Sequence, residues 1–385
     1  MLFRTRLAPL MATLAVVLVA CGGGDDSSSP TPPSPTPPRT SSVKVVGDSL
    51  NDSGTFGIKF TVQGTVAAPS LIWTDQVAAA VAVSGLCPRY QATGPSTVVL
   101  NAGATACTSY GVGGGRINPS GTADDTTPFS VVQQLKDLRT QQPLYNPEDL
   151  LLADGGGNDL ADLTGAYLGA AGDAGAAFLA LAGELLTPAE IGAAASLEAL
   201  GAAYATQLAN TLADALTTEA LNRDAQRIVV ITAPDITRTP RFLAVLAGVS
   251  MASSPAAAAQ VKAVVNQWVV AFNTQLKARF NGNSRVAVVD FYAEFNKWLD
   301  TPATYGLTNT TTPACPATGV DGQGLPTYSI ATCTAASLSA APPVGETGPD
   351  WWRTYVFSDN FHGTPRTNEL MGNLVVQALE AKGWK

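Results

Sequence analysis

Five short runs of apolar, mostly β-branched residues recur along the chain, and the segments between them are long enough to form crossover helices. The runs are largely continuous in apolar residues and do not alternate regularly with polar ones, which indicates strands that are covered on both faces. This pattern predicts an α/β fold: a three-layer α/β/α sandwich around a five-stranded parallel sheet. The predicted strands are residues 43–46, 97–100, 150–153, 228–232 and 286–290.

The segments between these runs supply the predicted helices. We expect one helix at 74–83, with Thr74 as a candidate N-cap, and another at 129–138. A third opens at Ser254-Pro255 and runs to about residue 280, since proline favours the first turn of a helix. A last helix covers 366–382, whereas 301–349 is rich in Thr, Pro and Gly without periodicity and is predicted to be loop.

A long alanine-rich segment, 160–223, separates the third and fourth predicted strands. It contains a capping box from Thr187 to Glu190, and leucine or tyrosine then recurs at every fourth position from Leu200 to Leu216. This spacing predicts a long amphipathic helix. The helix could be a lid over an apolar substrate or a layer packed on the sheet, and the layer is favoured because such stripes usually face a core.

The N-terminus carries the features of an export signal. Arg4 and Arg6 precede the apolar run 10–20, which is too short to span a bilayer as a permanent helix. The junction Leu18-Val19-Ala20-Cys21 resembles the lipobox of bacterial lipoproteins, in which the cysteine is lipidated. The alternative is an ordinary signal peptide that is cut nearby.

The chain therefore divides into three predicted parts. These are a lipoprotein signal peptide at 1–20, a Gly/Ser/Pro-rich tether at 21–41 and one folded domain at 42–385. A lipid on Cys21 would anchor the domain to a membrane. The expected localisation is that of an exported bacterial lipoprotein, at the outer membrane or the cell surface.

The other four cysteines form an even set in a chain that is predicted to be exported, so disulfides are the default expectation. Proximity in sequence favours Cys87–Cys107 and Cys315–Cys333 among the three connectivities that four cysteines allow. Neither pair has the spacing of metal ligands, and a single histidine cannot build a His-rich site, so no metal is expected. The net charge of −8, without clusters of Lys or Arg, excludes a nucleic-acid partner.

Two segments at opposite ends of the domain carry candidate catalytic chemistry. Gly47-Asp48-Ser49-Leu50 directly follows the first predicted strand, where parallel sheets place their sites. The only histidine of the chain, His362, follows Asp359 by three positions. If an imidazole activates a serine here, His362 is the only candidate.

Two further glycine-rich segments follow the second and third predicted strands. Gly111-Val112-Gly113-Gly114 offers backbone N–H groups that a substrate can approach closely, and Asn158 offers a side-chain donor within Gly156-Gly157-Asn158-Asp159. Acyl transfer needs a nucleophile, a base, an orienting acid and donors for the oxyanion, and these segments supply each of them.

The four segments resemble the sequence blocks of the SGNH/GDSL family of serine esterases and lipases, and the likeness extends from about residue 43 to the C-terminus. It implies an SGNH-hydrolase (flavodoxin-like) fold and an esterase without a cofactor that works through a serine acyl-enzyme. Ser49 would be the nucleophile, His362 the base and Asp359 its orienting acid. The backbone N–H of Ser49, that of Gly113 with Gly114 as the fallback, and the side chain of Asn158 would form the oxyanion hole.

Each of these segments also has a purely structural interpretation. Ser49 could be a helix cap, the Asn158 segment a tight turn, and Asp359 and His362 a surface pair on one helical turn. All four blocks in family order make these interpretations together improbable. Asp48 and Asp159 are interpreted as supports of their turns, and Trp351 and Trp352 as buried anchors or as an acyl pocket.

The predicted substrate is a small-molecule or lipid ester. A polysaccharide acetyl esterase and a non-catalytic surface binding protein on the same scaffold are the alternatives, and the second is disfavoured because Ser49, Asn158 and His362 are all present. The sequence leaves the acyl chain, the alcohol part and the oligomeric state open.

Overall fold

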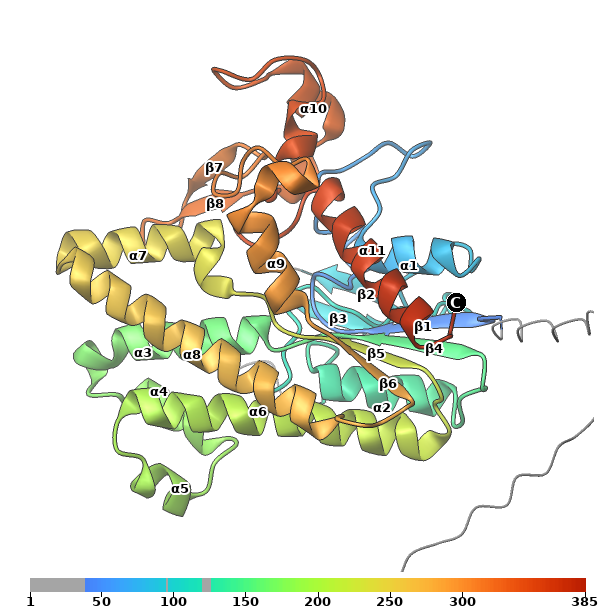
Figure 1. Ribbon diagram of the computed structural model, residues 1–385, viewed down its shortest axis with the longest axis horizontal. Helices are drawn as coiled ribbons and strands as arrows, with labels where there is room; N and C mark the ends of the chain where they lie inside the picture. Colours follow the sequence, from blue (N-terminus) through green and yellow to red (C-terminus); the bar gives the residue numbers. More distant parts are fainter. Residues whose placement is uncertain (1–38, 95, 120–125) are drawn as a thin grey trace, which may run out of the picture. The chain divides into compact units, whose positions relative to one another are not determined.

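The central sheet of the computed structural model holds four parallel strands in the order β1-β4-β5-β6 (Figure 1). The structure describes residues 39–94, 96–119 and 126–385, so the predicted signal peptide, the lipidation site Cys21 and most of the tether lie outside the described residues. The strands match four of the five predicted runs to within one residue at each end. They are β1 (Ser42–Val46), β4 (Asp149–Ala153), β5 (Ile228–Ile231) and β6 (Val286–Val289).

The fifth predicted strand forms but lies outside this sheet, which corrects the predicted strand number. β3 (Thr97–Leu100) pairs in antiparallel fashion with β2 (Tyr90–Gly94). Of its four residues only Val98 is buried, so the run packs through one face and lacks the two-sided burial of a central strand. The place beside β1 is taken by a short bridge at Ser109, where the N–H of Tyr110 donates to the carbonyl of Val45 at 2.7 Å.

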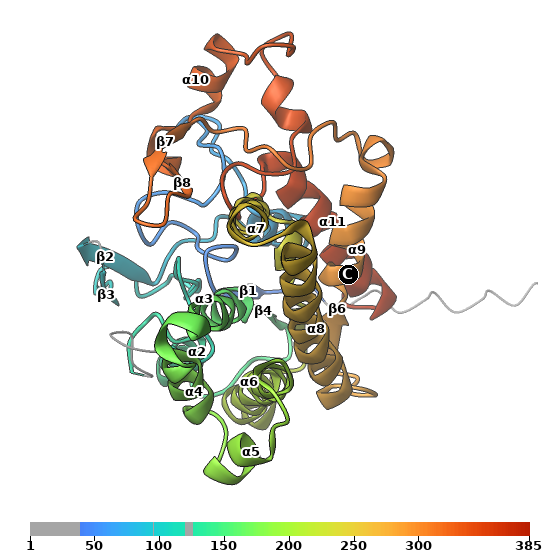
Figure 2. The same ribbon diagram turned by 90° about the vertical axis from the view of Figure 1, so that its left-hand side faces the viewer.

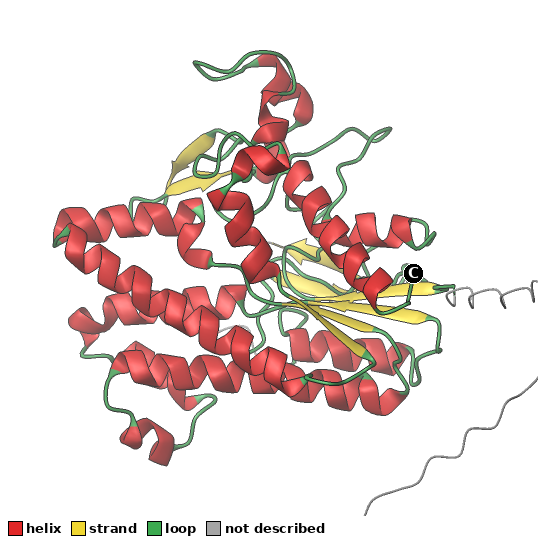
Figure 3. Cartoon of the chain, viewed as in Figure 1, coloured by secondary structure: helices red, strands yellow, loops and turns green. Residues whose placement is uncertain are grey.

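Alternate residues of the central strands enter two different cores. Leu150 and Leu152 of β4 pack on the side of α1, α9 and α11, and Leu151 and Ala153 pack on the side of α2, α3, α6 and α8. Figures 1 and 2 place α9 and α11 across the strands from α6, and Figure 3 shows helices on both sides of the sheet. The predicted three-layer α/β/α architecture is therefore present. The first layer consists of α1 (Trp73–Ala80), α9 (Phe291–Asp300) and α11 (Pro365–Ala381), and the second of α2 (Val131–Gln141), α3 (Gly157–Asp173), α6 (Leu197–Glu219) and α8 (Pro255–Arg279).

The alanine-rich segment forms part of the second layer. The leucine and tyrosine stripe of α6 is buried from Leu200 to Leu216, which is the arrangement expected of a helix packed on the sheet. The capping box is present, but it caps the short helix α5 (Pro188–Ala193), and Ser196 caps α6 in its place. α4 (Ala176–Gly183) connects α3 to α5.

Three of the predicted helices begin at a side-chain cap. Ser130 caps α2, Ser254 caps α8 and Thr364 caps α11. The candidate cap Thr74 is wrong, because α1 begins one residue earlier and the N–H of Ile72 donates to the carboxylate of Asp75 at 2.9 Å. α9 and α7 (Pro240–Ala252) were not predicted. In the described part of the chain, no helix combines the length and apolarity needed to cross a membrane.

The region predicted as loop between α9 and α11 contains short elements around a small core of its own. They are β7 (Ala317–Val320), β8 (Pro326–Tyr328) and α10 (Ala335–Ala340). Trp351 and Trp352 are buried in this core with the disulfide Cys315–Cys333, so both act as anchors and neither lines an acyl pocket.

The second disulfide, Cys87–Cys107, joins the two ends of the segment that carries the β2–β3 hairpin. Both favoured pairings are thus present, at sequence separations of 20 and 18 residues. Closure of loops of this length stabilises a fold by roughly 3 kcal/mol each.

Candidate active site

The candidate site lies at the carboxyl edge of the sheet, where three strands end side by side. Val46 of β1, Ala153 of β4 and Val230 of β5 are successive partners in register. The loops that follow them therefore start at the same edge, which is where parallel sheets carry their sites. Ser49 follows β1, and Asn158 follows β4 and lies in the first turn of α3.

A network of hydrogen bonds fixes the turn that carries Ser49. The side chain of Gln134 bonds both the N–H and the carbonyl of Gly47, at 2.7 and 3.0 Å, and the N–H of Leu50 donates to Asp48 Oδ1 at 2.9 Å. Gly47 has a φ of +145°, and a Cβ on it would lie 1.7 Å from Asp154 Oδ1, so only glycine fits this position. Asp48 supports the turn as predicted.

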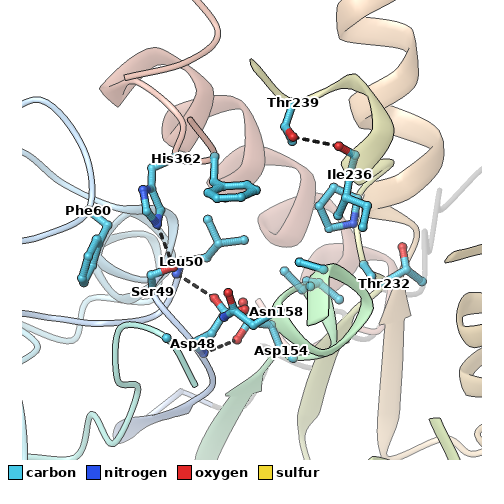
Figure 4. A pocket seen from close by; sticks show the side chains of 18 residues that line it. Asp48, Ser49, Leu50, Phe60, Asp154, Asn158, Thr232, Ile236, Thr239 and His362 are labelled. Carbon is cyan, nitrogen blue, oxygen red and sulfur yellow. Dashed lines mark hydrogen bonds between the residues drawn. The ribbon is translucent and has the colours of Figure 1, made fainter. Parts of the chain in front are cut away.

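Ser49, His362 and Asp359 form one hydrogen-bonded chain (Figure 4). Ser49 Oγ lies 2.8 Å from His362 Nε2, and His362 Nδ1 lies 2.7 Å from Asp359 Oδ2. Asp359 Oδ1 also accepts the backbone N–H groups of Phe361 and His362, at 2.9 and 2.8 Å, which fixes the carboxylate beside the imidazole. The arrangement lets the imidazole take the proton of the serine while the acid fixes its tautomer.

The glycine block corrects one predicted residue. The N–H of Gly113 donates to Asp52 Oδ2 at 2.8 Å, so it is already engaged and is not the oxyanion donor. Gly114, the fallback, lines the cavity beside Ser49. Gly114 is therefore the remaining candidate for the backbone donor of this block.

Asn158 points into the same cavity and also holds the glycine block in place. Its Nδ2 donates to the carbonyl of Gly115 at 2.9 Å, which uses one of the two amide hydrogens and leaves the other for an oxyanion. Asp159 accepts the N–H groups of Ile117 and Asn118, at 3.1 and 2.8 Å, and so supports the same loop as predicted. The loop after β3 is thus bound to the first turn of α3.

The cavity beside Ser49 has a volume of about 250 Å³ and a largely apolar lining. Phe60 stands on one side, with its ring centroid 4.9 Å from that of His362. The loop after β5 contributes Ile236 and Thr239 on the other side (Figure 4). Within the described residues, no group of three or more His, Cys, Asp or Glu side chains could hold a metal ion.

Comparison with known families agrees with this geometry. The model of GDSL-like lipases and acylhydrolases matches residues 43–375, which is nearly the whole described part of the chain. The chain belongs to the GDSL-like lipase/acylhydrolase family. A search of curated proteins found no match. Membership indicates an ester hydrolase in general terms and agrees with the resemblance seen in the sequence.

In this GDSL-like acylhydrolase two side chains that the sequence analysis missed support the site. Asp52 accepts the N–H groups of Gly54 and Thr55, at 2.9 and 2.7 Å, as well as that of Gly113. Asp154 accepts the N–H of Asp48 at 3.0 Å, directly beneath the nucleophile turn. Burial, followed by the charge of Asp48, raises the pKa of Asp154 well above its usual range. The sequence signal that could have identified Asp154 is its position directly after a buried strand.

The surroundings of His362 shift the pKa of its imidazole in this GDSL-like enzyme. Burial alone lowers the pKa of the imidazole, but the charge of Asp359, the hydrogen bond to it and the charge of Asp48 together outweigh burial. The pKa of His362 is therefore raised above its ordinary 6.5. For Asp359 burial acts in the opposite direction, yet the interactions with His362 and the two N–H donors lower its pKa below the ordinary 3.8.

These shifts predict the pH dependence of the reaction. Only a neutral imidazole can act as base, so we expect kcat/KM to rise with pH along a limb centred above 6.5. Protonated His362 stabilises the fold fully below the unfolded pKa, and this contribution is lost as pH rises through the folded pKa. The free energy of unfolding due to His362 should therefore fall over the range in which activity appears.

The measurement is a pH–rate profile of the wild type and of Asp359→Asn. Removal of the carboxylate leaves burial as the main influence, so the limb of the variant should move to lower pH while kcat falls. A limb that stays in place in Asp359→Asn would contradict the assigned cause.

Proposed function

We propose that this protein is a serine ester hydrolase that works through an acyl-enzyme. The observation that carries the proposal is the 2.8 Å contact between Ser49 Oγ and His362 Nε2, with Nδ1 held by Asp359. His362 takes the Oγ proton as Ser49 attacks the ester carbonyl, and the oxyanion accepts hydrogen bonds from the N–H groups of Ser49 and Gly114 and from Asn158.

Collapse of this intermediate completes the first half of the reaction. The bond from the carbonyl carbon to the alcohol oxygen breaks, and His362 gives its proton to the departing alcohol. A water molecule then loses a proton to His362 and attacks the acyl-enzyme, and the carboxylic acid leaves as Ser49 recovers its proton. Asp359 holds the tautomer of the imidazole throughout.

Labelling of the nucleophile tests the proposal. We expect the protein to hydrolyse p-nitrophenyl esters and to react with a fluorophosphonate probe, with the added mass on the peptide that contains Ser49. Ser53→Ala is the matched control, because Ser53 lies four residues away and its hydroxyl is engaged with Ser109 Oγ at 2.9 Å. Full labelling of the control and none of Ser49→Ala is the expected pattern, and a label on any other residue would refute the proposal.

We also propose that the enzyme is an exported lipoprotein anchored through Cys21. The lipobox-like junction supports it, and two disulfides within the described residues fit an oxidising compartment. We expect the full chain in the membrane fraction and Cys21→Ser in the soluble fraction or retained as precursor. Mass spectrometry of the mature N-terminus is the direct check, and an unacylated first residue would exclude the anchor.

A further inference from the structure

The cavity beside Ser49 has two chemically different ends, and the reaction geometry decides which part of an ester enters each. This inference rests on the proposed function. The departing alcohol must lie next to His362 Nε2, which protonates it, so it is on the side of Phe60. Figure 4 shows Ile236 and Thr239 across the cavity from Phe60. The acyl chain therefore extends toward Leu50 and the loop after β5.

The acyl end of the cavity presents a largely apolar surface to a hydrocarbon chain. Its lining includes Leu50, Ala233, Pro234 and Ile236. The hydroxyl of Thr239 donates to the carbonyl of Ile236 at 2.7 Å and so is engaged within the protein. Such a surface favours an unsubstituted alkyl chain over a hydroxylated or charged acyl group.

The volume of the cavity limits the length of that chain. An apolar cavity of about 150 Å³ takes up one benzene molecule, so about 250 Å³ accommodates on the order of ten non-hydrogen atoms. That volume holds an acyl group of roughly eight carbons only when the alcohol part lies outside the cavity, so eight carbons is an upper bound on the chain.

A second, smaller cavity of about 40 Å³ lies behind the acyl end, in the core between the sheet and α11. Phe291, Phe295 and Met371 line the second cavity but not the first. Four residues line both cavities and thus form the wall between them: Leu50, Pro234, Thr239 and Phe361.

We propose that Leu50 closes the acyl pocket and restricts this enzyme to esters of short and medium alkyl acids. It is the wall residue next to Ser49 in the chain, and it lines both cavities. Loss of its isobutyl group joins the two cavities into one longer apolar channel. Longer chains then bury methylenes that the wild-type pocket cannot cover.

The test compares the chain-length profile of kcat/KM, with p-nitrophenyl acetate to palmitate, in the wild type and in variants. The wild type should rise by up to about fourfold per methylene as far as roughly octanoate and then fall. In Leu50→Ala the ratio of kcat/KM for dodecanoate to that for butyrate should increase at least tenfold. The ratio is the readout because a substitution beside Ser49 can also lower all rates together.

Two further variants keep the test decisive. Met371→Ala enlarges the second cavity but leaves the wall intact, so its profile should match the wild type. Leu50→Phe fills the acyl end and should move the optimum to shorter chains, which tests the wall even if Leu50→Ala does not fold. A palmitate rate equal to that for octanoate in the wild type, an unchanged profile in both Leu50 variants, or a shift in Met371→Ala would each overturn the proposal. Failure to hydrolyse any ester of the panel would instead refute the proposed function.

Discussion

Ser49→Ala is expected to lower kcat/KM for p-nitrophenyl esters by about 10⁴–10⁶-fold, and His362→Ala by a similar factor. The two side chains act as one unit, since Ser49 Oγ is a poor nucleophile unless His362 Nε2, 2.8 Å away, takes its proton. The double variant should therefore be no less active than either single variant.

These rates are measured by steady-state kinetics, and thermal unfolding of each variant is the control for folding. Ser49→Ala removes only the Oγ atom and its hydrogen bond to His362, so the melting temperature should stay close to that of the wild type. His362 is the only imidazole of the chain. Wild-type rates in His362→Ala would show that another group, or none, activates the serine.

Asn158→Ala is expected to lower kcat by about 10²–10³-fold with KM nearly unchanged. The free hydrogen of its amide would bond the oxygen of the substrate carbonyl only when that oxygen becomes an oxyanion, so the loss falls on the transition state. The N–H groups of Ser49 and Gly114 would remain, which is why the loss is smaller than for Ser49→Ala.

Asn158→Ala also removes the hydrogen bond from the Asn158 amide to the carbonyl of Gly115, so the test needs a control for a lost structural hydrogen bond. Thr164→Ala is a matched variant on the same helix, α3: its buried hydroxyl donates to the carbonyl of Leu160, away from the cavity. It reports the effect of a lost hydrogen bond in this helix and should leave kcat unchanged. Slower but complete fluorophosphonate labelling of Asn158→Ala would show an intact nucleophile. A folded Asn158→Ala with full kcat would leave the backbone N–H groups as the whole oxyanion hole.

The sequence by itself determined the features that depend on local pattern. Largely apolar runs identified β1, β4, β5 and β6, because a strand that is buried on both faces does not show regular alternation of apolar and polar residues. The position of Ser49 after β1 followed from the run that precedes it. His362 was identified because no other histidine exists.

Only the tertiary structure decided the features that depend on contacts between residues far apart in the sequence. Thr97–Leu100 is as apolar as a central strand, yet the segment around Ser109 occupies the place beside β1. The sequence favoured Gly113 over Gly114 as donor, but the carboxylate of Asp52, 61 positions earlier, already accepts the N–H of Gly113. The wall between the two cavities likewise combines residues that are far apart in the sequence, among them Leu50, Pro234 and Phe361. Such choices rest on hydrogen bonds and contacts between segments that the fold brings together, and no periodicity within one segment encodes them.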